Sequence, residues 1–508
     1  MSKYANTRPN ILLVVTDQQR FDTLGCYQNP YVDTPNLDRF ASEGVLFKNA
    51  YCQSPVCTPS RASFLTGRYP RTTRCRANGQ SIPKEERLIS RVLADHGYYC
   101  SLSGKLHLAP CGPTACPIHE KRIDDGFTEF HWAHNPSGIG NAGLPESGGT
   151  YWSANEYSHW LFKHGKKYEY TDYDEKGYVK TGMEEEYHFT KWCIGNAIDW
   201  IRYSAEEKQQ MPDIVSPPWF YNINLFDPHH AFDPPKRLLD KYLERAEDLP
   251  LPGYRAGELD GKTIFQKLDH QSAYNNTSVA HHFSFDEMSD YEHRIIKAAY
   301  YAMVEMIDIQ FGLLMNALEE TGEDKNTIVI FTSDHGEMLG DHGIYLKGPY
   351  FYEAMVHVPL IFSWKDHFPG GRQLDTLTEL TDLTPTIEEF CLGTIEPGVQ
   401  GRSLAAILTG EQNPDTHRSS VYSEYCEAMP WHTKPEAYGS MVFDGRYKLS
   451  RYCSSKEGEL YDLLEDPNEF CNLWDSASHK DIKIRMLELL ADRLEETVDP
   501  LPLPTDKW

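Results

Sequence analysis

Three short apolar runs, each followed at once by polar residues, constrain the fold of this chain more than any other feature. They span residues 11–15, 219–225 and 327–331. A continuous apolar run of this length predicts a strand that is buried on both faces of a largely parallel sheet. Open α/β sheets bind their ligands beyond the carboxyl ends of such strands. The polar residues that follow these runs are therefore candidate site residues.

The other patterns are those of helices that cover a sheet. Segment 291–320 carries apolar residues at close to helical spacing, and Gly322 follows it, so we expect a long helix there. Together with the apolar runs, this helix predicts an α/β fold in which a large, mostly parallel sheet is sandwiched by helices.

The chain changes character after about residue 410. Short alternating segments at 440–443, 447–449 and 460–463, with an Asp-Gly turn at 444–445, predict a smaller antiparallel sheet. Segment 481–496 predicts a closing helix. A chain of 508 residues is too long for one ordinary core. We therefore expect a catalytic domain over 1–410, with an insertion at about 130–180, and an α+β subdomain over 411–508.

Composition excludes several classes of partner. The formal net charge of −26 argues against nucleic acid and anionic membranes, which attract an excess of Lys and Arg. The chain shows no signal-peptide pattern and no membrane-spanning run, so we expect a cytoplasmic protein. A periplasmic or secreted location is the alternative if a signal peptide has been removed. The twelve cysteines are expected to be mostly reduced.

The run Cys-Thr-Pro-Ser-Arg at 57–61 predicts an anion site. Thr58 suits a helix N-cap, Pro59 the first helical position and Gly67 the residue past the end. A short helix is thus expected immediately after Cys57, with its amides and dipole favouring negative charge there. Arg61 lies one turn further on the same face, within reach of that charge. For an isolated cysteine, a buried free thiol would be the alternative.

Acidic residues at two strand ends predict a metal site. Asp17 and Gln18 follow the first apolar run, and Asp334 and His335 follow the third. Two carboxylates, an amide oxygen and an imidazole can bind a divalent cation, and oxygen-rich sites suit calcium, magnesium or manganese. Taken singly, an Asp after a strand is more often a cap or turn residue.

The segment 57–68 resembles the signature of the sulfatase family, formylglycine-dependent enzymes of the alkaline phosphatase superfamily. The resemblance implies an alkaline phosphatase-like fold and an enzyme that cleaves sulfate esters. It also implies that a formylglycine-generating or anaerobic sulfatase-maturating enzyme oxidises Cys57 to formylglycine. Asp17-Gln18 and the Ser-Asp-His-Gly-Glu run at 333–337 look like the family's metal segments. Ca2+ is therefore the expected cofactor, with Mn2+ or Mg2+ as alternatives.

Further segments extend the resemblance to the substrate site. Ser-Gly-Lys-Leu-His-Leu at 103–108 resembles the family segment that places Lys105 on the sulfate oxygens and His107 beside the formylglycine. Asp-Pro-His at 227–229 resembles the element that reaches the leaving-group oxygen, which points to His229 rather than His230. Lys347 resembles the second sulfate-binding lysine, and Asn78 matches a polar position near the site.

The resemblance also implies a mechanism. One hydroxyl of the hydrated formylglycine, helped by Asp334, attacks sulfur and forms a covalent sulfate intermediate. His229 donates a proton to the departing alcohol, and His107 acts as the base that lets the remaining hydroxyl reform the aldehyde. Lys105, Lys347, Arg61 and the metal neutralise charge in the transition state. The products are an alcohol and sulfate, as for sulfuric ester hydrolases of class EC 3.1.6.

Two other readings remain open. Gln18 and His335 also look like residues of the phosphonate monoester hydrolases, which predicts a phosphonate monoester or phosphodiester hydrolase with the same nucleophile. Lys105 and His107 favour sulfate. The third reading is a non-catalytic, metal-stabilised binding protein.

The alcohol part of the substrate and the oligomeric state are both open. A small-molecule or saccharide sulfate ester is expected, and an oligomer is possible. Four aromatic residues are candidates for stacking on a sugar or an aryl group, namely Trp132, Tyr151, Trp152 and Trp160.

Overall fold

The computed structural model describes residues 7–111, 119–136, 155–211, 213, 215–272, 283–429, 432, 434–453 and 455–502. Its largest element is an eight-stranded sheet in the order β10-β2-β9-β8-β1-β7-β3-β4. Within this sheet β9 alone runs antiparallel to its neighbours. In sheet order the strands are Arg372–Glu379, Val45–Tyr51, His357–Ser363, Thr327–Ser333, Asn10–Thr16, Trp219–Asn224, Tyr99–Gly104 and Glu129–Trp132.

The three apolar runs form the middle of this sheet. They lie in β1, β7 and β8, and every residue of these strands is buried. β1 pairs in parallel with β7 on one side and β8 on the other. The predicted large, mostly parallel sheet is therefore confirmed.

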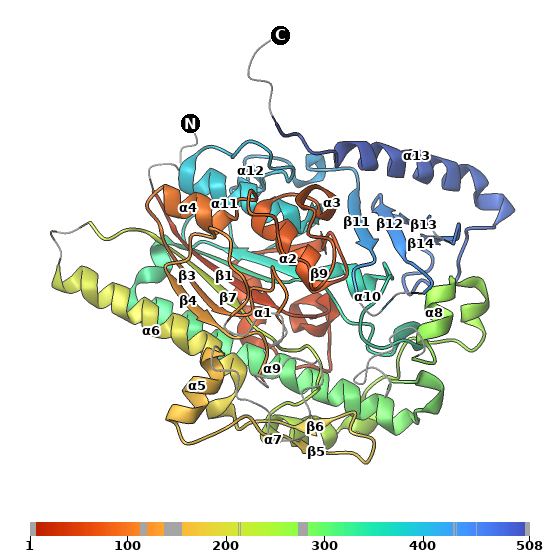
Figure 1. The fold of residues 1–508 in the computed structure, drawn as a ribbon, viewed down its shortest axis with the longest axis horizontal. Coiled ribbons are helices and arrows are strands. Elements are labelled where there is room, and N and C mark those ends of the chain that lie inside the picture. The colour runs from red at the N-terminus through yellow and green to blue at the C-terminus, as the bar shows by residue number, and fades with distance from the viewer. Residues whose placement is uncertain are drawn as a thin grey trace, which may run out of the picture.

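Helices cover both faces of the sheet (Figure 1). Because side chains alternate along a strand, β1 contributes to two separate cores. Leu12 and Val14 pack in the core formed with α1 (Pro35–Glu43), α6 (Phe189–Gln210), α7 (Lys236–Leu243) and α9 (Asp290–Thr321). The predicted helix at 291–320 is α9.

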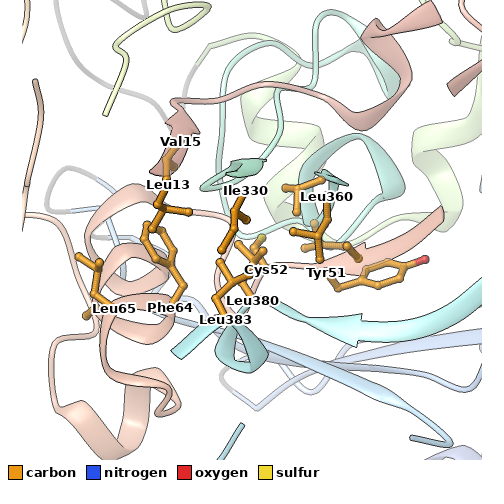
Figure 2. Close-up of a cluster of buried hydrophobic side chains, with 14 of the residues drawn as sticks. Leu13, Val15, Tyr51, Cys52, Phe64, Leu65, Ile330, Leu360, Leu380 and Leu383 are labelled. Carbon is orange, nitrogen blue, oxygen red and sulfur yellow. The ribbon is translucent and has the colours of Figure 1, made fainter. Parts of the chain in front are cut away.

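The opposite face carries the helix of the cysteine motif. Leu13 and Val15 pack in the core formed with α2 (Cys57–Thr66), α4 (Ile89–Asp95) and α11 (Leu383–Leu392). Figure 2 shows Phe64 and Leu65 of α2 beside Leu13 of β1. This packing fixes α2, and hence Cys57 at its start, against the central strands.

A four-stranded antiparallel sheet lies after residue 420, as predicted. Its strands, in order, are β11 (Val421–Cys426), β12 (Tyr438–Phe443), β13 (Tyr447–Tyr452) and β14 (Gly458–Asp462). α13 (Lys480–Glu496) covers it through Met486 and Leu490 (Figure 1). The expected smaller sheet plus helix is confirmed, whereas a domain boundary near residue 410 stays a prediction.

Part of the expected insertion is described. It contains α5 (Glu156–Lys163) and a hairpin of β5 (Thr171–Asp172) and β6 (Lys180–Thr181). Tyr151 and Trp152 lie outside the described residues. Trp132 is 1% exposed and donates a hydrogen bond to Glu120, so it is a core residue rather than a stacking surface. Trp160 is half-buried in α5.

The remaining short helices connect these layers. They are α3 (Pro70–Thr73), α8 (Ile264–Asp269), α10 (Glu353–Val356) and α12 (Ala405–Leu408). In the described part of the chain, no helix has both the length and the apolar character needed to span a membrane.

Candidate active site

The predicted site residues follow the carboxyl ends of the central parallel strands. Asp17 follows β1, Asp334 follows β8, Lys105 follows β3, and His229 lies on the loop after β7. Strand register brings these ends together, since Thr16 pairs with Ser333 at the ends of β1 and β8. The site thus lies at the edge where open α/β sheets place their ligands.

Gly104 allows the turn after β3 to form. Its φ of +97° lies in the region that favours glycine, and a Cβ there would lie 1.9 Å from the backbone oxygen of Asn224. This close approach of β3 and β7 directs Lys105, the next residue, into the site.

Four side chains form a cluster suited to a metal ion. Asp17, Cys57, Asp334 and His335 are all buried, and each offers a ligand atom within 4.8 Å of the others. The Nε2 atom of His335 lies 3.7 Å from Asp334 Oδ1 and 3.2 Å from Cys57 Sγ. Because Nδ1 of His335 faces the Gly336 carbonyl oxygen at 2.8 Å, the proton belongs on Nδ1 and the Nε2 lone pair faces the cluster.

Gln18, the fourth predicted ligand, is held differently. Its amide oxygen accepts a hydrogen bond from Lys347 at 2.7 Å, and its amide nitrogen donates to Glu337. Its backbone N–H donates to Asp334 Oδ1 at 3.0 Å. In this structure Gln18 therefore positions Lys347 and Asp334, and its role as a metal ligand stays a prediction.

Arg61 joins the two aspartates. Its guanidinium lies 2.8 Å from Asp334 Oδ2 and 3.2 Å from Asp17 Oδ2, and the three side chains are almost fully buried. It also donates to the carbonyl oxygen of Lys105 at 2.8 Å. Although burial raises the pKa of Asp17, the charges of Lys105, Arg61 and Lys347 hold that pKa well below its usual value. Arg61 thus helps to keep Asp17 ionised and holds both carboxylates in place.

The helix of the cysteine motif begins two residues earlier than predicted. α2 starts at Cys57, and Val56 takes the N-cap position, so Thr58 lies inside the helix and its predicted capping role is wrong. The cap comes from elsewhere, because Asn78 Oδ1 accepts a hydrogen bond from the Thr58 N–H at 3.0 Å. The predicted helix end is confirmed, since Gly67 follows the last residue with a φ of +67°.

This cap gives a testable prediction. Replacing Asn78 with Ala should lower the free energy of unfolding by about 1 kcal/mol, because one N–H at the start of α2 loses its acceptor. Asn78→Asp, which keeps a capping oxygen, should retain the wild-type value. Urea unfolding of the three proteins measures the difference, and equal stability of Asn78→Ala and wild type would contradict the capping role.

Cys57 lies among positive charges. Lys347 Nζ is 3.0 Å from Cys57 Sγ, and Lys105 Nζ is 3.8 Å away. Burial and Asp17 raise the pKa of the thiol, but the charges of Lys105 and Lys347 act against them, and the pKa lies below its ordinary value. The site therefore stabilises negative charge at Cys57, as the motif predicts.

Lys347 links Cys57 to His229. The ammonium group also lies 3.0 Å from His229 Nε2, while Nδ1 of His229 faces the carbonyl oxygen of His230. Nδ1 thus carries the ring proton, and Nε2 accepts from Lys347. Burial, His230 and Lys347 hold the pKa of His229 well below its usual value. His229 is therefore neutral here, and Lys347 is its adjacent proton source.

His107 lies on the turn that carries Lys105. It has a φ of +59°, and its backbone N–H donates to Glu120 Oε2 at 2.7 Å. Glu120 also accepts from the Leu108 N–H at 2.8 Å and from Trp132. The ring of His107 packs edge-on against His134, with centroids 4.8 Å apart. Burial and the charge of Lys105 hold its pKa well below normal, so the ring is neutral, as a base must be.

Sequence reasoning missed three residues that shape this site. Glu337 accepts the N–H groups of Leu339 and Leu346 and so holds the loop before Lys347. Glu337 lies within segment 333–337, and the resemblance of this segment to a metal segment of the family could have identified Glu337 as a site residue. Glu120 and His134 fall where the sequence shows no recognisable motif.

Comparison with known proteins agrees with the motifs. The family model described as "Sulfatase" matches residues 9–390, and "N-sulphoglucosamine sulphohydrolase, C-terminal" matches residues 340–496. The chain is 30% identical over 500 residues to an arylsulfatase of Clostridium perfringens, covering 96% of this chain and 95% of that protein. It is 25% identical to an N-acetylglucosamine-6-O-sulfatase of Bacteroides thetaiotaomicron, covering 98% of this chain and 88% of that protein.

The fold is shared with solved structures. A phosphonate monoester hydrolase of Agrobacterium radiobacter superposes with a TM-score of 0.76 at 24% identity, covering 97% of both chains. This likeness concerns the fold alone. The family match spans most of the chain, and the predicted resemblance is confirmed. The chain therefore belongs to the sulfatase family and is a sulfatase, an enzyme that hydrolyses sulfate esters.

Proposed function

We propose that this sulfatase cleaves a sulfate monoester of a small molecule or a saccharide through a formylglycine made from Cys57. The observation that carries the proposal is the position of Cys57, 3.0 Å from the ammonium of Lys347 and 3.2 Å from Nε2 of His335. The named relatives support the substrate class, since one is an arylsulfatase and one an N-acetylglucosamine-6-O-sulfatase.

The residues around Cys57 fit a hard divalent cation. Asp17 and Asp334 direct their Oδ1 atoms at the cluster while Arg61 binds their Oδ2 atoms, so one oxygen of each carboxylate is kept for a metal. The Nε2 lone pair of His335 completes three ligands. We propose Ca2+ here, with Mn2+ or Mg2+ as alternatives. Such an ion supplies positive charge next to the nucleophile and the sulfate oxygens.

The first step makes an S–O bond and breaks another. A hydroxyl group of the hydrated formylglycine gives its proton to the Asp334 carboxylate, and its oxygen attacks sulfur. The bond from sulfur to the alcohol oxygen breaks, and the alcohol oxygen takes up a proton. Lys105 and Lys347 neutralise the sulfate oxygens in the transition state. Because His229 is neutral and bonded to Lys347, we assign proton delivery to this pair, with Lys347 supplying the proton and His229 placing it.

The second step releases sulfate without attack of water on sulfur. The remaining hydroxyl gives its proton to His107, the aldehyde C=O reforms, and the bond from carbon to the sulfate oxygen breaks. Water then rehydrates the aldehyde. A thiol or a serine hydroxyl at this position lacks the second hydroxyl, so the modification of Cys57 by a maturating enzyme is part of the proposal.

Phosphonate monoester hydrolysis is the second candidate, and Gln18 and His335 favour it because they also look like residues of the phosphonate monoester hydrolases. The two functions separate on paired substrates: kcat/KM on 4-nitrophenyl sulfate against kcat/KM on a 4-nitrophenyl phenylphosphonate. We expect the sulfate to be hydrolysed at least about 10-fold faster, because Lys105 and His107 are present. A faster phosphonate reaction would overturn the sulfate assignment.

The same preparation tests the nucleophile. Peptide mass spectrometry over residues 50–68 should show formylglycine in place of Cys57. An active enzyme whose Cys57 is entirely unmodified would refute the proposed nucleophile, whichever substrate it prefers.

A further inference from the structure

A second group of potential metal ligands lies on the turn after β3, apart from the aspartates. His107, Cys111 and His134 each offer one ligand atom, and these atoms lie within 4.8 Å of one another. His107 and Cys111 are buried, and His134 is half-buried. We call these three residues the soft-ligand cluster.

The two imidazoles of the cluster have unused ring nitrogens. Nδ1 of His107 and Nδ1 of His134 are both buried and have no hydrogen-bond partner among the described residues. A buried polar atom without a partner costs free energy, so such atoms call for an explanation. Two of them in adjacent rings, beside a thiol, are what a metal ion would satisfy.

Glu120 supports the cluster from behind. Its carboxylate fixes the His107 backbone at 2.7 Å and lies 3.6 Å from Cys111 Sγ. A carboxylate that holds the ligands of a metal site from outside is a usual feature of such sites. It also balances the positive charge that a bound ion would add to this buried region.

We propose that His107, Cys111 and His134 form a second metal site that binds Zn2+, distinct from the hard-cation site at Asp17 and Asp334. Two nitrogens and one thiolate are typical zinc ligands, whereas calcium and magnesium prefer oxygen. On binding, the Cys111 thiol gives its proton to solvent and its sulfur bonds to the ion. A water molecule takes the fourth position.

The geometry requires only a small adjustment. Zinc bonds of about 2.3 Å to sulfur and about 2.0 Å to nitrogen place the ligand atoms roughly 3.3–3.5 Å apart in a tetrahedron. The cluster atoms lie within 4.8 Å of one another. Side-chain rotations that move each ligand atom by about an ångström would therefore bring the three atoms to the separations that zinc requires.

Occupancy of this site inhibits the enzyme. Zinc at the cluster holds His107, the base of the second step, and adds positive charge next to Lys105. This consequence rests on the proposed function of His107, whereas the binding itself does not.

The binding test uses Co2+ as a spectroscopic substitute for Zn2+. A Cys57→Ala background removes the thiol of the hard-cation site, and excess Ca2+ fills that site. We expect a thiolate-to-cobalt absorption band that Zn2+ abolishes at one equivalent. The band should vanish in Cys57→Ala/Cys111→Ser and persist in Cys57→Ala/Cys453→Ser, because Cys453 is exposed and distant in sequence.

A second variant guards against misfolding. In Cys57→Ala/His134→Ala the thiol remains, and its affinity for Co2+ should fall at least about 10-fold. A band that survives in Cys57→Ala/Cys111→Ser, or the absence of any band in Cys57→Ala, would overturn the site. Both results are measured by metal binding and do not depend on enzyme activity. A failure of the second metal site can therefore be told apart from a failure of the proposed function.

Inhibition is tested on the mature enzyme with Ca2+ in excess. Micromolar Zn2+ should slow hydrolysis of 4-nitrophenyl sulfate by the wild type but have at least about 10-fold weaker effect on Cys111→Ser, whose basal rate is unchanged. Equal inhibition of the two proteins would overturn the inhibitory role.

Discussion

Cys57→Ser is expected to lower the steady-state turnover of 4-nitrophenyl sulfate by at least about 10³-fold. The serine hydroxyl takes the same place between Lys347 and the aspartates and can still attack sulfur. It lacks the second hydroxyl of a hydrated aldehyde, so the sulfate ester that it forms has no internal exit. We therefore expect one burst of nitrophenol and then an inactive enzyme, whose peptide at position 57 carries one added SO3 group by mass spectrometry.

Two control variants sharpen this expectation. Cys57→Ala should show neither burst nor adduct, because it has no nucleophile. Cys453→Ser, at an exposed cysteine, should keep the wild-type rate. Continuous turnover by Cys57→Ser would contradict the proposed release step, since it would require direct attack of water on the trapped ester.

The framework of the site could be predicted because its signals are local. The run 11–15 is apolar without interruption, and a strand buried on both faces needs such a run whatever its partners are. The polar residues after the strands then meet at one edge, because parallel neighbours end together. For this reason Asp17 and Asp334 were candidates for one site from the sequence, whereas Lys105 was assigned to it only by the family resemblance.

The contacts that determine the role of each residue could not be predicted from the sequence, because they join segments that are far apart along the chain. Thr58 has the composition of an N-cap, but Asn78 caps the helix from a separate turn. Gln18 looked like a ligand, yet its amide oxygen is bonded to Lys347, 329 residues away. Propensity describes what a side chain does locally, and tertiary contacts override it here.

The same limit applies to the second metal site. His107 and Cys111 are close in the sequence, but His134 reaches them only because β4 pairs with β3 and carries the following turn alongside. The positions of these three residues in the sequence do not by themselves indicate that His134 lies beside His107 and Cys111. Glu120, which holds the His107 turn, was invisible for the same reason.

Arg61→Ala is expected to lower the free energy of unfolding by about 3–5 kcal/mol. Arg61 is 1% exposed and is paired with two fully buried carboxylates, so its loss leaves Asp17 and Asp334 buried with less compensating charge. Urea unfolding in the presence of a chelator measures the loss. Arg74→Ala is the matched control, because its ion pair with Glu85 lies at the surface and should contribute nothing measurable.

Calcium should reverse part of this loss. An ion between the aspartates supplies the charge that Arg61 no longer provides, and it binds only the folded protein, so stability should rise with calcium concentration. Arg61→Lys should fall between wild type and Arg61→Ala, since an ammonium keeps the charge but cannot bind both carboxylates and the Lys105 carbonyl in one plane. If Arg61→Ala were as stable as wild type in the chelator, the two aspartates would not depend on Arg61. The cation site would then have to be stabilised by its other neighbours, which include Lys105, His335 and the Gln18 N–H.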